Sequence, residues 1–189
     1  MIKVGIVGED PNDTLSIQKL LYKKYKSKVR FCVLARGIRG HQLDNPKLLR
    51  SLIVEYANNS CQFVLFVRDL DGYSTEKAKV KKVRTWAENI DAKLKSNGLL
   101  LINIWELEAL ILADIGAFSK KYGISSSYSG NPMMQREPKE YLKHITRHSR
   151  RPYSVSHCPE IFETLDLSTV VKNCPYFAEF ISEFDKKIK

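Results

Sequence analysis

The sequence predicts an α/β protein with a mainly parallel four-stranded sheet flanked by helices and a C-terminal helical extension. Four short apolar runs end in turn residues, and segments with helical spacing of apolar residues lie between them. Strands that alternate with helices are typical of parallel βαβ units. After residue 121 a polar loop (SSSYSGN) precedes short helical segments with no further strand. We therefore expect an α/β core over residues 1–120 and a helical extension over residues 121–189 packed on it.

The predicted strands are short and almost continuously apolar, which is the pattern of strands buried on both faces of a sheet. They are expected at residues 2–7, 30–35, 62–67 and 99–104. Each is followed by turn or polar residues, so each should end at the same edge of a parallel sheet.

The predicted helices follow from capping residues and from the spacing of apolar side chains. Asp13 or Thr14 can cap a first helix. Asn45-Pro46 is a favourable start for a second helix, because proline suits the first helical position. Further helices are expected at residues 75–95, 105–118, 138–148, 159–165 and 176–187.

The composition favours a polyanionic partner. The formal charge is +10, from 31 Lys and Arg against 21 Asp and Glu. Residues 1–104 carry 19 basic and 10 acidic side chains, whereas residues 105–189 carry 12 and 11. A basic surface around an acidic centre suits nucleic acid that is gripped by cations and processed at a metal ion. A soluble basic protein without such a partner is the alternative.

The expected location is the cytoplasm, with no membrane partner. No apolar run approaches the roughly 20 residues that span a bilayer. The N-terminal sequence lacks the cleavage region of a signal peptide. The four cysteines form no Cys-x-x-Cys pair and are expected to be free thiols of a reducing compartment.

Acidic residues follow three of the predicted strands. Glu9 follows the first, Asp69 and Asp71 follow the third, and Glu106 and Glu108 follow the fourth. Because open parallel sheets bind ligands at the carboxyl ends of their strands, these carboxylates are expected to converge. In an Asp-x-Asp segment on extended backbone, alternate side chains share one face, so both can reach one ion. Mg²⁺ suits such a site, since it is bound through one or two carboxylates, waters and phosphate oxygens.

Each of these acids also has a structural interpretation as a turn residue, a cap or a favourable charge at a helix N-terminus. The occurrence of Glu9, Asp69 and Asp71 at strand ends favours the metal site over this alternative. Glu108 is harder to explain structurally, because it interrupts the apolar stretch 107–113. An unpaired carboxylate there would cost on the order of several kcal/mol.

The order of these acids resembles the Toprim domain. The Glu-Gly-x-x-Asp segment of that family corresponds to residues 9–13 (EDPND), with Asp10 in place of glycine, and its Asp-x-Asp corresponds to residues 69–71. Residues 106–114 (ELEALILAD) are similar to a signature of small stand-alone Toprim-like proteins from mobile and phage-defence loci, related to OLD-type nucleases. The resemblance covers residues 2–120, extends loosely beyond them, and implies a Toprim-like, Rossmann-like fold.

The resemblance also implies a function: a nuclease or related phosphodiester-processing enzyme that depends on Mg²⁺ (or Mn²⁺), acts on DNA or RNA, and serves phage defence or a mobile element. In this family the aspartate pair holds the ion, so Asp69 and Asp71 are the expected ligands. Glu9 is expected to bind the ion or to transfer a proton, and Glu108 to occupy a second metal position or to orient the first ligands. Water is the expected nucleophile, and a protein partner encoded nearby is implied.

Basic residues near the predicted site are expected to contact phosphate groups. Arg36 and Arg39 belong to a loop with two glycines after the second strand, where arginine can bind phosphate through two hydrogen bonds. One helical face that begins in the helix predicted at 138–148 carries four more cations at steps of four, four and three: Lys139, Lys143, Arg147 and Arg150. An ordinary turn and a solvated helix face are the corresponding alternatives.

Two other functions remain open from the sequence. Residues 7–13 resemble the acidic pocket of a response-regulator receiver, in which Asp69 would accept a phosphoryl group. A receiver also needs Ser or Thr after the fourth strand and Lys-Pro after a fifth, and neither is present. The other alternative is a non-catalytic Toprim module that binds nucleic acid, against which Glu9, Asp69 and Asp71 argue.

Overall fold

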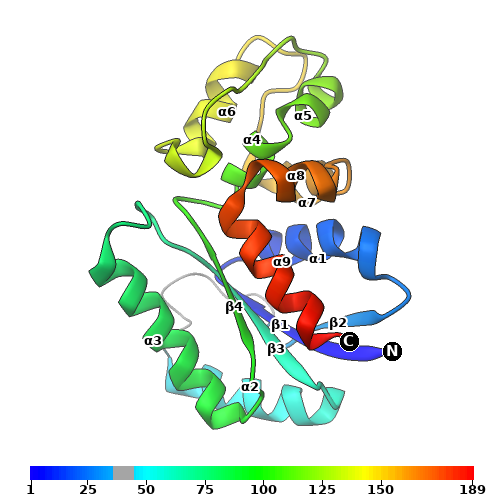
Figure 1. Ribbon diagram of the computed structural model, residues 1–189, viewed down its shortest axis with the longest axis vertical. Coiled ribbons are helices and arrows are strands. Elements are labelled where there is room, and N and C mark those ends of the chain that lie inside the picture. The colour runs from blue at the N-terminus through cyan, green and yellow to red at the C-terminus, as the bar shows by residue number, and fades with distance from the viewer. Residues whose placement is uncertain (36–44) are drawn as a thin grey trace.

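The chain folds around a four-stranded parallel sheet (Figure 1). The structure, a computed structural model, describes residues 1–35 and 45–189. The strands are β1 (Ile2–Gly8), β2 (Val29–Val33), β3 (Phe63–Asp69) and β4 (Leu99–Asn103). Their order is β2-β1-β3-β4, and each neighbouring pair is parallel. The predicted α/β class is confirmed, and the architecture is Rossmann-like.

The order of the strands places the reversal of winding between β1 and β3. The chain passes from β1 outward to β2 and then returns to β3 on the other side of β1. In open α/β sheets the crevice at such a reversal, beyond the carboxyl ends of the strands, is the usual ligand site. Gly8 ends β1 there, and a Cβ at this position would lie 2.7 Å from Cγ2 of Thr14. Glycine therefore lets the first helix start close against the strand.

Helices cover both faces of the sheet. On one face lie α1 (Pro11–Tyr25) and α9 (Pro175–Lys187), and on the other lie α2 (Pro46–Asn59) and α3 (Lys77–Leu94) (Figure 1). The strands alternate accordingly, since Leu65 packs in the cluster that contains α1 and α9, whereas Phe66 packs in the cluster that contains α2 and α3. Sheets buried on both faces produce the continuously apolar strands seen in the sequence.

The C-terminal segment shares the core of the sheet. Its elements lie at the top of Figure 1, above the carboxyl ends of the strands, before α9 returns along the sheet. They are α4 (Ala109–Ala113), α5 (Ile115–Tyr122), η2 (Pro132–Met134), α6 (Pro138–Thr146), η3 (Val155–His157), α7 (Cys158–Phe162) and α8 (Leu167–Asn173). Phe184 of α9 packs on Tyr25 and Phe63, with ring centroids 5.0 and 6.0 Å apart. One continuous hydrophobic cluster therefore joins the sheet to α9.

Two helix predictions need correction. The first helix is capped by Asp10, whose side chain accepts a hydrogen bond from the backbone N–H of Asn12 (2.7 Å), so Asp13 and Thr14 are not caps. The reason is Pro11, which fits the first helical position and starts the helix earlier. The single helix predicted over 105–118 is two helices, α4 and α5, separated at Asp114, whose carboxylate caps α5.

In the two ranges that the structure describes, no helix combines the length and apolar character needed to cross a bilayer.

Candidate functional site

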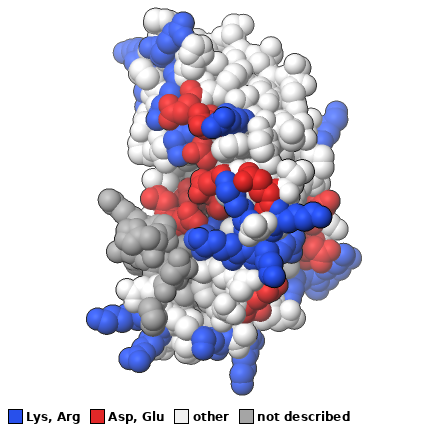
Figure 2. Space-filling model, turned by 90° about the vertical axis from the view of Figure 1, so that its left-hand side faces the viewer, with Lys and Arg blue, Asp and Glu red and all other residues white. Residues whose placement is uncertain are grey.

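Carboxylates gather at the carboxyl ends of the strands. Glu9 follows β1, Asp69 ends β3, and Asp13 lies in the first turn of α1. Glu108 immediately precedes α4, in the segment that follows β4. Figure 2 shows acidic side chains grouped in the middle of the corresponding face of the molecule, with Lys and Arg around them. We call Glu9, Asp13, Asp69 and Glu108 the carboxylate cluster.

Asp69 interacts electrostatically with the other three members of the cluster. Asp69 is opposite Asn103 in the register of β3 and β4, and the side-chain amide of Asn103 donates to Oδ1 of Asp69 (2.9 Å). Burial raises the pKa of Asp69 well above 3.8, and the negative charges of Asp13, Glu108 and Glu9 raise it further, while the Asn103 hydrogen bond opposes them. The protein therefore holds this carboxylate in a setting that disfavours its negative charge.

Asp13 is also close to other negative charges of the cluster. Burial raises its pKa from 3.8 to about 8, and the charges of Asp10, Glu108 and Glu9 add to the increase, while Lys139 opposes it. Since α1 starts at Pro11, its first turn brings Asp13 toward the ends of β1 and β3. Sequence reasoning did not select Asp13 as a site residue, although it is the last residue of the acidic segment 9–13.

Glu9 contributes charge to the cluster and also forms an ion pair. Its Oε1 lies 2.6 Å from Nε of Arg68. The guanidinium of Arg68 lies over the ring of Trp86, 4.7 Å from the centroid. Because Arg68 precedes Asp69 on extended backbone, their side chains leave β3 on opposite faces. Arg68 thus points away from Asp69, and its ion pair with Glu9 holds the Glu9 carboxylate at the edge of the cluster.

Asp71 differs from the sequence-based expectation. Its backbone is left-handed (φ 51°) and its side chain is exposed, whereas Leu70 is buried. The chain turns here because the backbone N–H of Asp71 donates to the carbonyl of Trp105 (3.0 Å). The expectation that the side chains of Asp69 and Asp71 share one face of an extended segment is therefore wrong. The role of Asp71 as a ligand stays a prediction.

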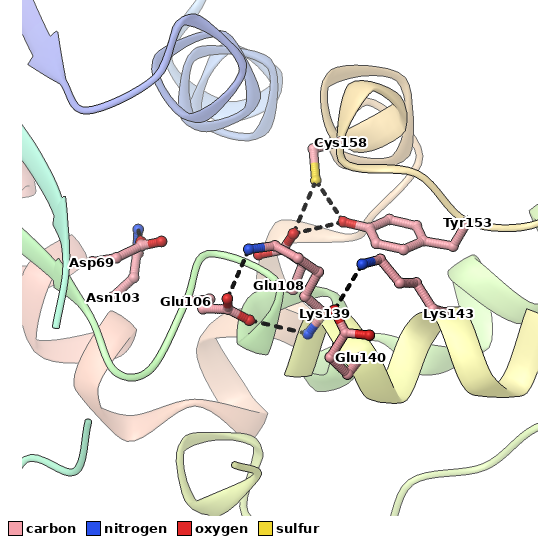
Figure 3. Close-up of polar contacts among 9 residues, drawn as sticks. All are labelled: Asp69, Asn103, Glu106, Glu108, Lys139, Glu140, Lys143, Tyr153 and Cys158. Atoms are coloured by element: carbon pink, nitrogen blue, oxygen red, sulfur yellow. Dashed lines mark hydrogen bonds and ion pairs between the residues drawn. The ribbon is translucent and has the colours of Figure 1, made fainter. Parts of the chain in front are cut away.

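Glu108 is buried, with 3% of its surface exposed, and the extension supplies its partners. The hydroxyl of Tyr153 donates to Oε1 of Glu108 (2.7 Å), and Sγ of Cys158 lies 3.0 Å from the same hydroxyl (Figure 3). Burial raises the pKa of Glu108, whereas the Tyr153 hydrogen bond and the charge of Lys139 oppose that increase. The cost expected from the sequence for an unpaired carboxylate is thus reduced by a partner 45 residues away.

Lys139 brings a positive charge to the cluster. Pro138 starts α6, so the backbone N–H of Lys139 is available, and it donates to Oε2 of Glu106 (3.2 Å) while Nζ donates to Oε1 (2.7 Å; Figure 3). Burial lowers the pKa of Lys139, but the Glu106 hydrogen bond and the charges of Glu108, Glu106 and Asp69 outweigh it and raise the pKa overall. Lys139 therefore remains charged and partly offsets the crowding of carboxylates.

The other side chains predicted to contact phosphate are not part of the carboxylate cluster's described contacts. Lys143 pairs with Glu140 of the same helix (2.7 Å). Arg147, which follows α6, hydrogen-bonds the imidazoles of His144 and His148. The predicted contacts at Arg36 and Arg39 lie outside the described residues.

The donor set fits a hard cation without forming a closed cage for one. Within residues 1–35 and 45–189, no three His, Cys, Asp or Glu side chains are grouped so as to hold one ion. Mg²⁺ needs only one or two carboxylates, because waters and phosphate oxygens complete its shell. Asn103 is 3% exposed, and its Oδ1 has no hydrogen-bond partner in the described part of the chain. Asp69, Asp13 and the Asn103 carbonyl oxygen would be the residues that hold such an ion.

Fold and site together define a Rossmann-like α/β protein with a carboxylate cluster at the carboxyl edge of its sheet. The chain belongs to the family called domain of unknown function DUF4276, which matches residues 9–185 and so includes strands β2 to β4 and most of the helical extension, but not β1. No curated protein and no solved structure matches the chain significantly.

The raised pKa values predict how the stability of the metal-free protein depends on pH. Between about pH 4 and about pH 8 an aspartate of the unfolded chain has lost its proton, whereas Asp13 retains its proton in the folded protein. The pKa of Asp69 is raised in the same direction, so Asp69 also keeps its proton above the pH at which an unfolded aspartate loses it. The folded state then binds more protons, so the contribution of these groups to the free energy of unfolding decreases as the pH rises. Mg²⁺ should offset this loss by neutralising the ionised cluster.

Melting temperatures measured with and without Mg²⁺ test this expectation. The increase caused by Mg²⁺ should be larger near about pH 8 than near about pH 5, because binding requires deprotonated ligands. Asp13→Asn should reduce both the pH dependence and the increase. An increase that is the same at both pH values in the wild-type protein would contradict it.

A second prediction concerns the hydroxyl of Tyr153. Tyr153→Phe keeps the ring and removes the donor to the buried Glu108, so the free energy of unfolding should fall by about 1–3 kcal/mol. Urea denaturation at neutral pH measures the change. Tyr22→Phe is the matched control, because Tyr22 is 55% exposed and its loss of a hydroxyl should be close to neutral. Equal stability of the two variants would show that Tyr153 does not support Glu108.

Proposed function

We propose that this protein is a Mg²⁺- or Mn²⁺-dependent phosphodiesterase that cleaves the backbone of DNA or RNA. The observation that carries the proposal is the carboxylate cluster, in which burial and the charges of the neighbouring carboxylates raise the pKa values of Asp13 and Asp69. A cluster that disfavours its own charge gains most from a divalent cation. Such clusters, placed where a parallel sheet binds ligands, are typical of catalytic sites.

The surroundings of the cluster favour a phosphate-bearing substrate. Arg68 and Lys139 lie at its edge, and the whole chain carries a net charge of +10. Asp69 and Asp13 would hold the ion, which supplies stabilisation of the negative charge that develops on the phosphoryl oxygens. Glu9 is the group proposed to accept or release a proton, and Lys139 is the cation proposed to meet the phosphate. A cytoplasmic location and a protein partner encoded nearby are part of the same proposal.

A cleavage assay tests this function. Purified protein should cleave labelled single- or double-stranded DNA or RNA with Mg²⁺ or Mn²⁺, and EDTA should stop the reaction. Bis-p-nitrophenyl phosphate, a simple phosphodiester, serves as a second substrate that needs no sequence or structure. Binding of nucleic acid with no cleavage of any substrate would instead favour the non-catalytic module.

One observation supports a second candidate, a receiver-like phosphoacceptor. Asp69 ends β3 beside acids from the β1–α1 segment, as the phosphoacceptor of a receiver does. Against this candidate, Asn103 rather than Ser or Thr ends β4, and the described sheet has no fifth strand. Incubation with acetyl phosphate distinguishes the two, because only a phosphoacceptor would gain a phosphoryl group on Asp69.

A further inference from the structure

A second basic site lies at the opposite end of α6 from Lys139. There the C-terminal end of α5 and the segment after α6 line an open pocket of about 920 Å³. It lies at the end of the molecule occupied by α5 and α6, at the top of Figure 1. Its basic lining residues are Lys120, Lys121, His148, Arg150 and Arg151. No Asp or Glu is among the described residues that line this pocket, which we call the α5–α6 pocket.

Most of these cations lack a neutralising partner. Arg151 pairs with Glu160 through Nη1 (2.6 Å). Lys120, Lys121 and Arg150 are exposed, and over the described ranges none of them forms an ion pair. On α6 itself, by contrast, Lys139 and Lys143 are each paired with a glutamate. Unpaired positive charge is therefore gathered in the pocket, which includes Arg150 of the basic row seen in the sequence, whereas the two lysines of that row on α6 are neutralised.

Local structure explains only part of this arrangement. Gly123 (φ 63°) ends α5, and lysines in a last turn interact favourably with the helix dipole. That effect accounts for Lys120 and Lys121 but not for Arg150 and Arg151, which reach the same pocket from a segment distant in sequence. The local field is positive: burial and then the charges of Arg151 and Lys121 lower the pKa of His157, while Glu160 opposes them. Converging like charges without acids favour an anionic ligand.

We propose that the α5–α6 pocket binds the phosphate backbone of a nucleic-acid strand whose cleaved phosphate lies at the carboxylate cluster. This assignment rests on the proposed function and adds a second contact for the same substrate. Arginine binds phosphate oxygens through two parallel hydrogen bonds, and lysine binds them as a point charge. Exposed side chains at the rim of an open pocket can follow a flexible backbone, whatever its base sequence.

The length of α6 fixes the spacing of the two contacts. Lys139 lies at its first turn beside Glu106, and His148 lies beyond its other end in the pocket. Seven residues at 1.5 Å each separate Lys139 from Thr146, the last residue of α6, by about 10 Å. A strand that rises about 3.4 Å per nucleotide covers this distance in about three nucleotides. An oligonucleotide must therefore extend at least about three nucleotides from the cleaved bond to occupy both sites.

The test compares two triple variants with the same loss of charge. The pocket variant combines Lys120→Gln, Lys121→Gln and Arg150→Gln. The control combines Lys81→Gln, Lys82→Gln and Lys93→Gln, three exposed positions of α3, which covers a face of the sheet away from the pocket. Fluorescence anisotropy measures binding of a labelled single-stranded oligonucleotide of about 20 nucleotides, as DNA and as RNA, in EDTA over a series of salt concentrations.

The pocket variant should bind at least about tenfold more weakly than the control at low salt, and its salt dependence should flatten by about two units, about 0.7 for each lost phosphate contact. Its cleavage of bis-p-nitrophenyl phosphate should equal that of the control. Equal binding by the two variants overturns the proposal. The proposal is also overturned if the wild-type protein binds vesicles that contain phosphatidylserine and does not bind the oligonucleotide.

The experiment also distinguishes failure of the pocket proposal from failure of the proposed function. Because binding is measured without a divalent ion, weaker binding by the pocket variant supports the pocket even if no phosphodiester is cleaved. In that case the proposed function fails and the pocket stands. Cleavage of oligonucleotides by both variants with equal binding and equal rates has the opposite meaning: the function stands and the pocket fails.

Discussion

Asp69→Asn is expected to lower Mg²⁺-dependent phosphodiester cleavage by at least about 100-fold while raising the melting temperature of the metal-free protein. Changes to groups that only support a metal ligand cost about 10–100-fold, so loss of a ligand should cost at least as much. The amide keeps the shape of the side chain and can still accept the hydrogen bond from Asn103. At alkaline pH, where Asp69 is ionised, it also removes one negative charge from a cluster in which burial and the neighbouring carboxylates raise the pKa of Asp69. Activity and stability should therefore change in opposite directions.

Rates are measured at saturating Mg²⁺ and melting temperatures in EDTA. Glu88→Gln, at an exposed position of α3, is the matched control and should change neither. A variant that is less stable and less active would indicate simple misfolding. A variant that is more stable and fully active would mean that Asp69 has no part in the reaction.

Glu9→Gln is expected to reduce the same cleavage by at least about 100-fold, since loss of a general acid or base typically costs about 10²–10⁴-fold in rate. Glu9 lies at the end of β1, and its carboxylate is oriented by the ion pair with Arg68. The substitution keeps the reach of the side chain and removes its charge and basicity. Nucleic-acid affinity in EDTA should change little, because Glu9 does not supply positive charge.

Single-turnover rates at saturating Mg²⁺ and oligonucleotide separate this effect from weaker binding. The pH profile of the remaining activity adds a second readout, because a group that transfers a proton shapes the profile and a purely structural group does not. Cleavage by Glu9→Gln at the wild-type rate would rule out the proposed mechanism, although the metal site at Asp69 could remain.

The fold could be predicted because its signals are local. Each strand is a short apolar run bounded by turn residues, and each long helix has its own spacing and start signals, as Asn45-Pro46 does for α2. The break at Asp114 was missed, because an apolar stretch does not reveal that an aspartate within it will cap the following helix and accept a hydrogen bond from the backbone N–H of Asp166 (2.7 Å). The unpredicted helix α8 starts at the same contact.

The sequence could identify a site residue only where its position at the end of a predicted strand places it in the site. Asp69 lies at the expected strand end. Asp71 does not share its face, since a backbone contact with Trp105 turns the chain, and no pattern around residues 69–71 encodes that contact. Tyr153 reaches Glu108 over 45 residues, and pairing at such a separation leaves no local signal.

The return of α9 to the sheet has a consequence for biosynthesis. Phe184 covers Tyr25 and Phe63, which belong to the first third of the chain. During translation, at about 5–20 residues per second, the sheet face that receives α9 stays uncovered until the ribosome has made and released that helix. Lys139 and Tyr153 also emerge long after Asp13 and Asp69. For on the order of several seconds the nascent chain therefore exposes the apolar sheet face that α9 later covers, and during this time the face is open to non-native association.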